Sequence, residues 1–392
     1  MSVQSRTYAE LDGLRAVAAI AVVGTHTAFW AGIYGEGVLG ALTHRLEIGV
    51  AIFFVLSGFL LGRPWVSRAL DSSASAPTRG SVRRYYRKRF FRIFPVYVLT
   101  VVAAMVLLPA NRDEGVGVWV QNLTLVAHLG DPELPAGLTQ MWSLTVEASF
   151  YLALPLIGWC LVRVGRGSLS RLMTALGALA LLSIGWNIVS WGLDSGLSVA
   201  LRAQLPSHLG WFVAGIALAA LATDADSASP STLTRRASRL AADRATCWIA
   251  AGAVLVLVAT PLGGPVGLFQ PDLDGALVRH VGYAVVSLLL VAPCVLAPRP
   301  TSWLAHPLAR HLGHTSFALF CCHLIVIELI VPGLGLTQFE ISWPLLLVLV
   351  LAISQAVSEV LYRVVERPAN RLGHRRSSAA ATTRATASTP HH

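Results

Sequence analysis

The sequence predicts an all-α polytopic membrane protein, a bundle of about ten transmembrane helices with both termini in the cytoplasm. Apolar residues make up 55% of the 392 residues and charged residues only 13%, a balance far from that of soluble globular chains. Apolar windows of roughly 20 residues, the length that crosses the hydrocarbon core of a bilayer, recur along the chain. The net charge of +10 comes almost wholly from arginine, which gathers in alternate loops.

Ten apolar windows qualify as transmembrane spans. In chain order they are 11–30, 46–66, 93–110, 142–162, 172–192, 206–223, 246–262, 278–297, 314–333 and 343–363. The segment 118–128 is too short and too polar to cross a bilayer, so we expect an interfacial or re-entrant piece there.

The arginines orient the predicted bundle, because cytoplasmic loops collect Lys and Arg. With the amino terminus inside, the outer loops hold little beyond Arg45, Arg112 and Arg202, with Arg279 at an edge. The even number of spans returns the carboxyl terminus to the cytoplasm. Because the positive charge is concentrated in alternate loops, it does not indicate nucleic-acid binding.

Lys88 is the only lysine, and the preference for arginine is typical of GC-rich genomes. We therefore expect a multi-pass protein of a bacterial plasma membrane.

The predicted spans form a single domain. Residues 1–368 make up this transmembrane domain, and 369–392 have the low-complexity composition of a disordered cytoplasmic tail. Residues 224–245 have the composition of a flexible cytoplasmic linker. The five cysteines lie in or beside apolar segments, so reduced thiols are expected rather than a disulfide framework.

The first span contains two ionisable residues, Arg15 and His26, which are costly inside a membrane. Their separation is about three helical turns, so both lie on one face, roughly 16 Å apart along the axis. That spacing suits a slot for a long donor with an anionic head and a reactive end, such as an acyl-coenzyme A. The structural alternatives are an interfacial Arg15 paired with Asp12 and a hydrogen-bonded core histidine at position 26.

The Arg15 and His26 pattern resembles the signature of the membrane acyltransferase-3 family. Further stretches resemble motifs of that family in the same order: FFVLSGFLLGR (53–63), RKRFFRIFPVY (87–97), MWSLTVEASFY (141–151), LGHTSFALFCCH (312–323) and YRVVERP (362–368). The resemblance extends over residues 11–368 and is to the stand-alone form, without a C-terminal hydrolase-like domain.

The resemblance implies a membrane O-acyltransferase that moves acetyl or another short acyl group from acyl-CoA to a hydroxyl of a sugar-containing acceptor. The expected acceptors are a macrolide or other secondary metabolite, or a cell-surface polysaccharide. Acetyl-CoA is the expected donor, a substrate rather than a tightly bound cofactor, and the lipid bilayer is the other partner. The competing class is a membrane transporter or exporter that uses the buried Arg, His and Glu.

His26 is the expected general base of this reaction. It takes a proton from the acceptor hydroxyl, which attacks the thioester carbonyl and expels the coenzyme A thiolate, with a covalent acyl-histidine as the alternative. Glu147 lies five residues into the fourth span, at a similar depth, and is expected to hydrogen-bond to His26 and support its charged form. The alternative is a Glu147 that pairs with a different helix.

Three arginines are expected to bind the coenzyme A phosphates. They are Arg15 and, by the family pattern, Arg89 and Arg92 of the basic run 83–92. Composition alone assigns this run to anionic lipid, and both roles can coexist.

Four further residues are assigned to the substrate cavity: Ser57, Trp142, Ser316 and His323. Ser57 lies in a glycine-rich stretch where close helix packing is the favoured interpretation, since no strained turn marks it as a nucleophile. Ser316 and His323 are two turns apart on one helical face, and a structural hydrogen bond for His323 is the alternative. Trp142 belongs to the motif at 141–151.

No metal site is predicted, because His306, His311 and His314 lack Cys or carboxylate partners at ligand spacing. Glu366 is expected to pair with an arginine at the inner end of the last span.

Overall fold

The computed structural model describes residues 8–35, 37–73, 78–127, 134–193, 196–267 and 271–374, and all regular structure within these ranges is helical. The α-helices are α1 (Ala9–Trp30), α2 (Gly37–His44), α3 (Ile48–Leu70), α4 (Arg79–Leu107), α5 (Val116–Leu123), α7 (Met141–Gly165), α8 (Leu169–Trp191), α9 (Gly196–Arg202), α10 (Leu205–Ala225), α11 (Thr232–Ala242), α12 (Arg244–Ala259), α13 (Leu273–Leu296), α14 (Pro307–Gly333) and α15 (Trp343–Leu361). The predicted all-α class is confirmed for the described residues.

Nine helical segments among the described residues are long and apolar enough to cross a membrane, and α11 with α12 makes a tenth if this bent pair is one span. Nine of the predicted windows therefore correspond to these nine segments. The window 246–262 corresponds to α12, whose 16 residues reach about 24 Å, less than the hydrocarbon core. Asp243 caps α12 through the Thr246 amide, and the chain turns by 84° there.

The prediction of a flexible linker over 224–245 is wrong. Helix α10 continues to Ala225, and Ser231 then caps α11 by accepting a hydrogen bond from the Thr234 amide. Thr234 and Ala241 are buried where α11 packs against α10 and α13, while the arginines of α11 are exposed. The segment is ordered because α11 is amphipathic and buries one face, a pattern that its polar overall composition does not reveal.

The chain stays helical after α15. Residues Tyr362–Glu366 form one π-helical turn, and the helix continues past Pro368 to His374. The rest of the predicted tail, 375–392, lies outside the described residues.

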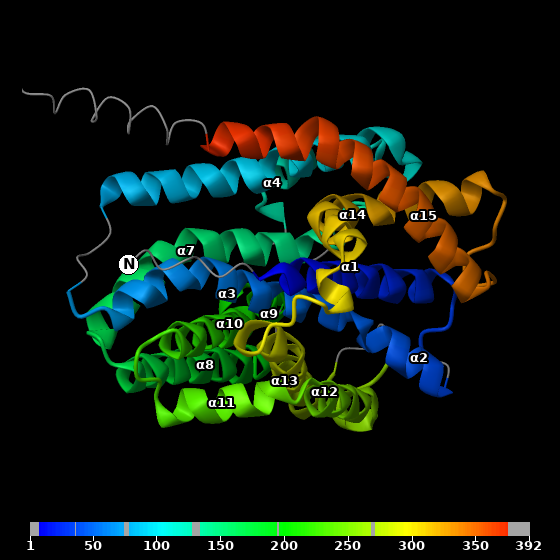
Figure 1. The fold of residues 1–392 in the computed structure, drawn as a ribbon. Helices are drawn as coiled ribbons and strands as arrows, with labels where there is room; N and C mark the ends of the chain where they lie inside the picture. The colour runs from blue at the N-terminus through cyan, green and yellow to red at the C-terminus, as the bar shows by residue number, and fades with distance from the viewer. Residues whose placement is uncertain are drawn as a thin grey trace, which may run out of the picture.

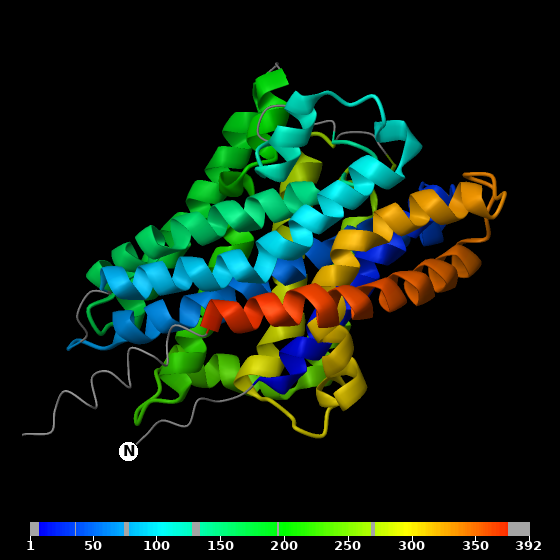
Figure 2. The same ribbon diagram turned by 90° about the horizontal axis from the view of Figure 1, so that it is seen from above.

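Helices α1 and α3 run through the centre of the bundle (Figure 1). Helices α4 and α15 lie on one side of this central pair, and α8, α10, α11 and α12 lie on the other. Both views show the end of α15 beside α4 (Figure 2), and the turn 362–366 contacts α4. Helix α3 itself contacts α1, α7, α10 and α13, so it borders most of the interior.

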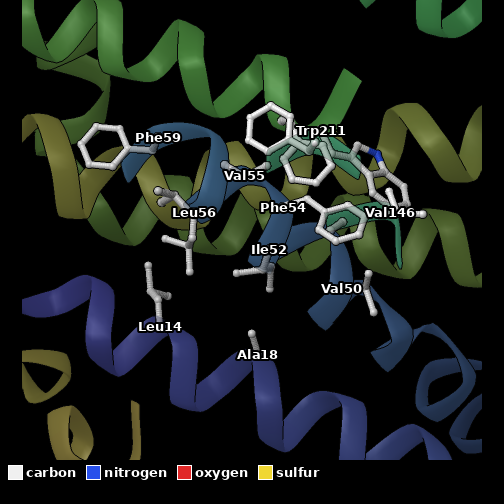
Figure 3. Packing of buried hydrophobic residues seen from close by; sticks show 14 of the residues in the cluster. Leu14, Ala18, Val50, Ile52, Phe54, Val55, Leu56, Phe59, Val146 and Trp211 are labelled. Carbon is white, nitrogen blue, oxygen red and sulfur yellow. The ribbon is translucent and has the colours of Figure 1, made fainter. Parts of the chain in front are cut away.

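Helix α3 packs apolar side chains on two sides (Figure 3). Ile52 and Leu56 face Leu14 and Ala18 of α1, whereas Phe54 points towards Trp211 of α10. These side chains are almost fully buried, so α3 is held by packing on both faces.

Small residues bring α3 into backbone contact with its neighbours. A Cβ atom on Gly58 would lie 2.1 Å from the Phe212 carbonyl oxygen, and one on Gly215 would lie 2.0 Å from that of Val55. On the other side, a Cβ atom on Gly49 would lie 2.3 Å from the Ala18 carbonyl oxygen. The predicted close packing at the glycine-rich stretch around Ser57 is thus confirmed.

We expect Gly58→Ala to lower the thermal stability of the purified protein in detergent. The added methyl group has no room against the α10 backbone, so overpacking of about 1–3 kcal/mol outweighs the roughly 1 kcal/mol that alanine gains as a helix former. Gly177→Ala in α8 is the matched control, because its Cβ atom meets nothing within 4 Å. Equal melting temperatures for the two variants would contradict this account of the α3–α10 contact.

Candidate active site

A cavity of about 750 Å³, its mouth included, lies between α1, α3, α4, α7 and α14. Its polar lining includes five of the predicted site residues: Arg15, Ser57, Arg89, Arg92 and Glu147. Apolar side chains make up much of the remaining wall, among them Phe317 and Phe320 of α14. We call this space the arginine cavity.

The guanidinium groups give the arginine cavity a net positive charge. Arg15, Arg89 and Arg92 all line it, and Glu147 is the one carboxylate among the described residues of the lining. Arg92 forms an ion pair with the fully buried Glu366, which confirms the expected arginine partner of that residue. Arg89 lies over the Tyr151 ring at 5.8 Å, and its Nε is buried without a hydrogen-bond partner in the described structure. The cavity therefore offers donors to an anion.

The structure gives Asp12 partners other than Arg15. Its carboxylate lies 3.7 Å from Arg310 and 3.5 Å from His314, both on α14. Arg15 turns instead to the cavity, so the predicted alternative of an Arg15–Asp12 pair is not what the structure contains.

Glu147 accepts two hydrogen bonds inside the arginine cavity. The Ser57 hydroxyl and the Tyr151 hydroxyl each donate to Oε1 at 2.5 Å. Tyr151 is a functional candidate that the sequence reasoning missed, although it lies in the same motif. It follows Glu147 by four residues, the spacing that puts two side chains on one helical face, and this signal was sufficient to find it.

The partner of His26 is His323, not Glu147. Nδ1 of His26 lies 2.9 Å from Nε2 of His323, which joins α1 to α14. Nδ1 of His323 contacts the carbonyl oxygens of Phe320 at 2.8 Å and Leu319 at 3.2 Å, so that nitrogen carries a proton. In the neutral ring Nε2 of His323 is then an acceptor, and His26 donates to it through Nδ1. Nε2 of His26 is left with its lone pair, the state that a general base requires.

The structure separates Arg15 from His26, which the helix spacing predicted to lie in one continuous slot. Arg15 lines the arginine cavity, but the imidazole of His26 is not part of that lining. The histidine pair lies directly behind the wall, since the Phe320 ring is 6.0 Å from that of His323 and faces the cavity. Ser316 is buried and donates to the Gly313 carbonyl oxygen at 2.7 Å, within its own helix and away from the cavity.

A second cavity, also about 750 Å³ with its mouth, contains Trp142 of the predicted site. Trp191, Trp211, Tyr283, Asn187 and Arg202 line it as well, and we call it the tryptophan cavity. Val50 of α3 lines both cavities, so a single side chain contributes to the wall of each. None of these residues except Trp142 was assigned to a site from the sequence, because they come from separate spans without a shared motif.

Comparison with known proteins places these features in a family. The model of a family described as acyltransferase domain matches residues 8–363. The acyltransferase MdmB of Streptomyces mycarofaciens is 36% identical over 157 residues, which are 37% of this chain and 38% of that protein.

Two further relatives were found. The peptidoglycan O-acetyltransferase OatA of Listeria monocytogenes is 27% identical over 394 aligned positions, covering 94% of this chain and 57% of that protein. Nodulation protein 10 of Rhizobium leguminosarum bv. viciae is 28% identical over 172 residues, 37% of this chain and 43% of that protein. The chain thus spans between 38% and 57% of the length of these relatives. No solved structure matches the chain.

We expect Glu366→Ala to destabilise the protein by about 3–5 kcal/mol, because Arg92 is then left as a largely buried cation without its partner. The double variant Arg92→Met/Glu366→Met removes both charges and regains most of that stability. Thermal unfolding in detergent measures both effects. Arg363→Ala is the control, since it removes an ion pair to Glu359 from a side chain that is 69% exposed and changes stability by less than about 0.5 kcal/mol.

Proposed function

The chain belongs to the acyltransferase-3 family, and from that premise we propose that it transfers a short acyl group, acetyl above all, from acyl-CoA to a hydroxyl of a sugar-containing acceptor. The acceptor would be a macrolide or other glycosylated secondary metabolite, or a cell-surface polysaccharide. The proposed location is the plasma membrane of a bacterium, with both termini in the cytoplasm.

The arginine cavity is the observation that carries the choice of donor. Coenzyme A has a polyanionic head, and the cavity brings three guanidinium groups together with a buried Nε of Arg89 that has no partner in the described structure. Arginine is suited to phosphate because its planar fork donates two parallel hydrogen bonds. The remaining, largely apolar wall, with Phe317 and Phe320, fits a pantetheine arm that must pass through the bilayer without water.

The histidine pair supports a direct base mechanism. His26 Nε2 accepts the proton of the acceptor hydroxyl while the oxygen attacks the thioester carbonyl. The tetrahedral intermediate collapses with loss of the coenzyme A thiolate, which takes up the proton from His26. The products are the acyl ester and free coenzyme A, and His323 stays neutral throughout because it only holds the tautomer of His26.

Glu147 takes a different place in this proposal from the one that the sequence suggested. It is engaged by Ser57 and Tyr151 and does not contact His26, so it cannot orient that imidazole directly. We assign it to positioning within the arginine cavity, where it holds two hydroxyl groups beside the path of the acyl arm.

The acyl group must pass the Phe320 side of the wall to reach His26. The ring of Phe320 lies 6.0 Å from that of His323, so this side chain stands between the cavity and the histidine pair, and its ring packs on Phe53 at a centroid distance of 6.4 Å. The proposed transfer therefore requires a rotamer change of Phe320.

We expect His26→Ala to reduce transfer of radiolabelled acetyl from acetyl-CoA to sugar acceptors by about 10²–10⁴-fold, the range of a lost general base. His323→Ala is expected to lower kcat by about 10–10²-fold with the KM for acetyl-CoA unchanged, because it removes only the acceptor that fixes the His26 tautomer. His311→Ala, at a half-exposed side chain bonded to Glu359, is the matched control. Full transfer by His26→Ala would exclude the base role, and uptake of acceptor without acylation would favour a carrier.

We expect Arg89→Ala to raise the KM for acetyl-CoA about tenfold or more and to leave the KM for the sugar acceptor unchanged, since it removes a charge-assisted contact to the phosphates. Arg79→Ala, at the exposed start of the same helix, is the control for a general loss of positive charge. Equal KM values for the two variants would mean that the basic run serves lipid rather than coenzyme A.

A further inference from the structure

The tryptophan cavity brings together indole rings from three helices. Trp142 comes from the start of α7, Trp191 from the end of α8 and Trp211 from the first half of α10. Because successive spans alternate in direction, these positions lie towards the side of the bundle opposite the amino terminus of α1. Tyr283 of α13 adds a fourth ring to the lining.

The rings of this cavity are held in place by neighbouring groups. Arg202 covers one face of Trp191, with its guanidinium carbon 4.0 Å from the ring centroid. Trp211 stacks on His280 at 5.1 Å with an interplanar angle of 19°, and its Nε1 donates to the His280 carbonyl oxygen at 2.9 Å. Fixed rings lose little conformational entropy when a ligand packs on them, so the cavity is preorganised.

The lining of the tryptophan cavity also contains hydrogen-bond donors and hydrogen-bond acceptors. Glu47 accepts from the Tyr283 hydroxyl at 2.9 Å and lies 3.5 Å from Arg279. Asn187 uses Nδ2 for the carbonyl oxygens of Ser183 and Ser207, both at 2.9 Å, so its amide oxygen remains the acceptor for a ligand. Arg202 supplies further donors from the wall.

A wall of this composition matches a pyranose ring. A pyranose presents C–H groups on its faces and hydroxyl groups around its edge, so it needs flat aromatic surfaces together with donors and acceptors at the side. Tryptophan is also common at membrane interfaces, but an interfacial tryptophan anchors to lipid, whereas these rings line a cavity with charged and amide side chains. We propose that the tryptophan cavity binds the pyranose ring of the acceptor, presented from the membrane side opposite the termini.

The position of the cavity places that sugar near the proposed base. Glu47 lines the cavity and belongs to the 3-10 turn Arg45–Glu47, which contacts α1, the helix that carries His26. Val50 lines both the tryptophan cavity and the arginine cavity. In this proposal, a hydroxyl at the inner edge of the bound sugar approaches His26 from the tryptophan cavity, and the acyl arm approaches it from the arginine cavity. This inference rests on the proposed function and specifies its acceptor site.

The test measures equilibrium binding of sugars to the full chain in lipid nanodiscs, by saturation-transfer NMR, independently of turnover. The probes are methyl β-glucopyranoside and methyl N-acetyl-β-glucosaminide, with mannitol as an open-chain polyol that has no ring face. We expect the wild type to bind both glycosides and to bind mannitol far more weakly. Trp191→Ala lowers affinity for the glycosides about tenfold, Trp191→Phe restores part of it, and acetyl-CoA binding is unchanged in both.

Trp303→Ala is the matched control, because Trp303 is 60% exposed and outside both cavities. Wild-type protein that binds the glycosides no better than mannitol would overturn the inference, as would Trp191→Ala that binds them like wild type. An acetyl-transfer assay on the same samples separates the two proposals. Sugar binding that depends on Trp191 without any acetyl transfer rejects the enzyme and keeps the sugar site, whereas transfer with an unchanged acceptor KM in Trp191→Ala keeps the enzyme and rejects the sugar site.

Discussion

Backbone contact between α3 and its two neighbours is the constraint on which the rest of the structure depends. Gly49 lets α3 meet α1 at Ala18, and Gly58 with Gly215 lets it meet α10. Inside a bilayer no hydrophobic force draws apolar helices together, so tight van der Waals contact between small residues has to supply the association. Because α3 is fixed on both sides, its residues Ser57 and Val50 are fixed as well. Ser57 lines the arginine cavity and Val50 lines both cavities, so α3 forms part of the wall of each.

Most buried arginines inside the bundle have a carboxylate or carbonyl partner. Arg244 forms a bidentate pair with Glu10 at 2.5 and 3.1 Å, and the fully buried Arg45 donates to the carbonyl oxygens of Val258, Gly263 and Gly264. These guanidinium groups are neutralised or solvated by protein, as a low-dielectric interior requires. The arginine cavity differs, because its three guanidinium groups outnumber the carboxylates around them. An excess of half-buried positive charge is the physical reason to look for an anionic ligand there.

In the proposed reaction, the two cavities hold the donor and the acceptor on either side of the reacting groups, and the histidine pair supplies the base. The proposed donor site holds guanidinium groups and apolar walls, and the proposed acceptor site holds aromatic rings together with charged and amide side chains. The tautomer of His26 is set by His323. A histidine oriented by a second histidine carries no added charge into the bilayer. A carboxylate in the same place would require the enzyme to bury an anion beside each thiolate that it releases.

The sequence by itself determined the membrane class, the approximate spans, the family and the cluster of Arg15, Arg89, Arg92, Ser57 and Glu147, because hydropathy, helical spacing and short motifs are local properties of the chain. It could not determine which helices meet. Glu147 and His26 were predicted to lie at one depth and to meet, but their partners are Tyr151 and His323. Helix rotation sets these partners, and a one-dimensional pattern does not encode it. The tryptophan cavity likewise forms only when α7, α8, α10 and α13 pack together. Residues 224–245 are ordered by the helix cap at Ser231 and by the buried face of α11, and neither feature is visible in the average composition of the segment.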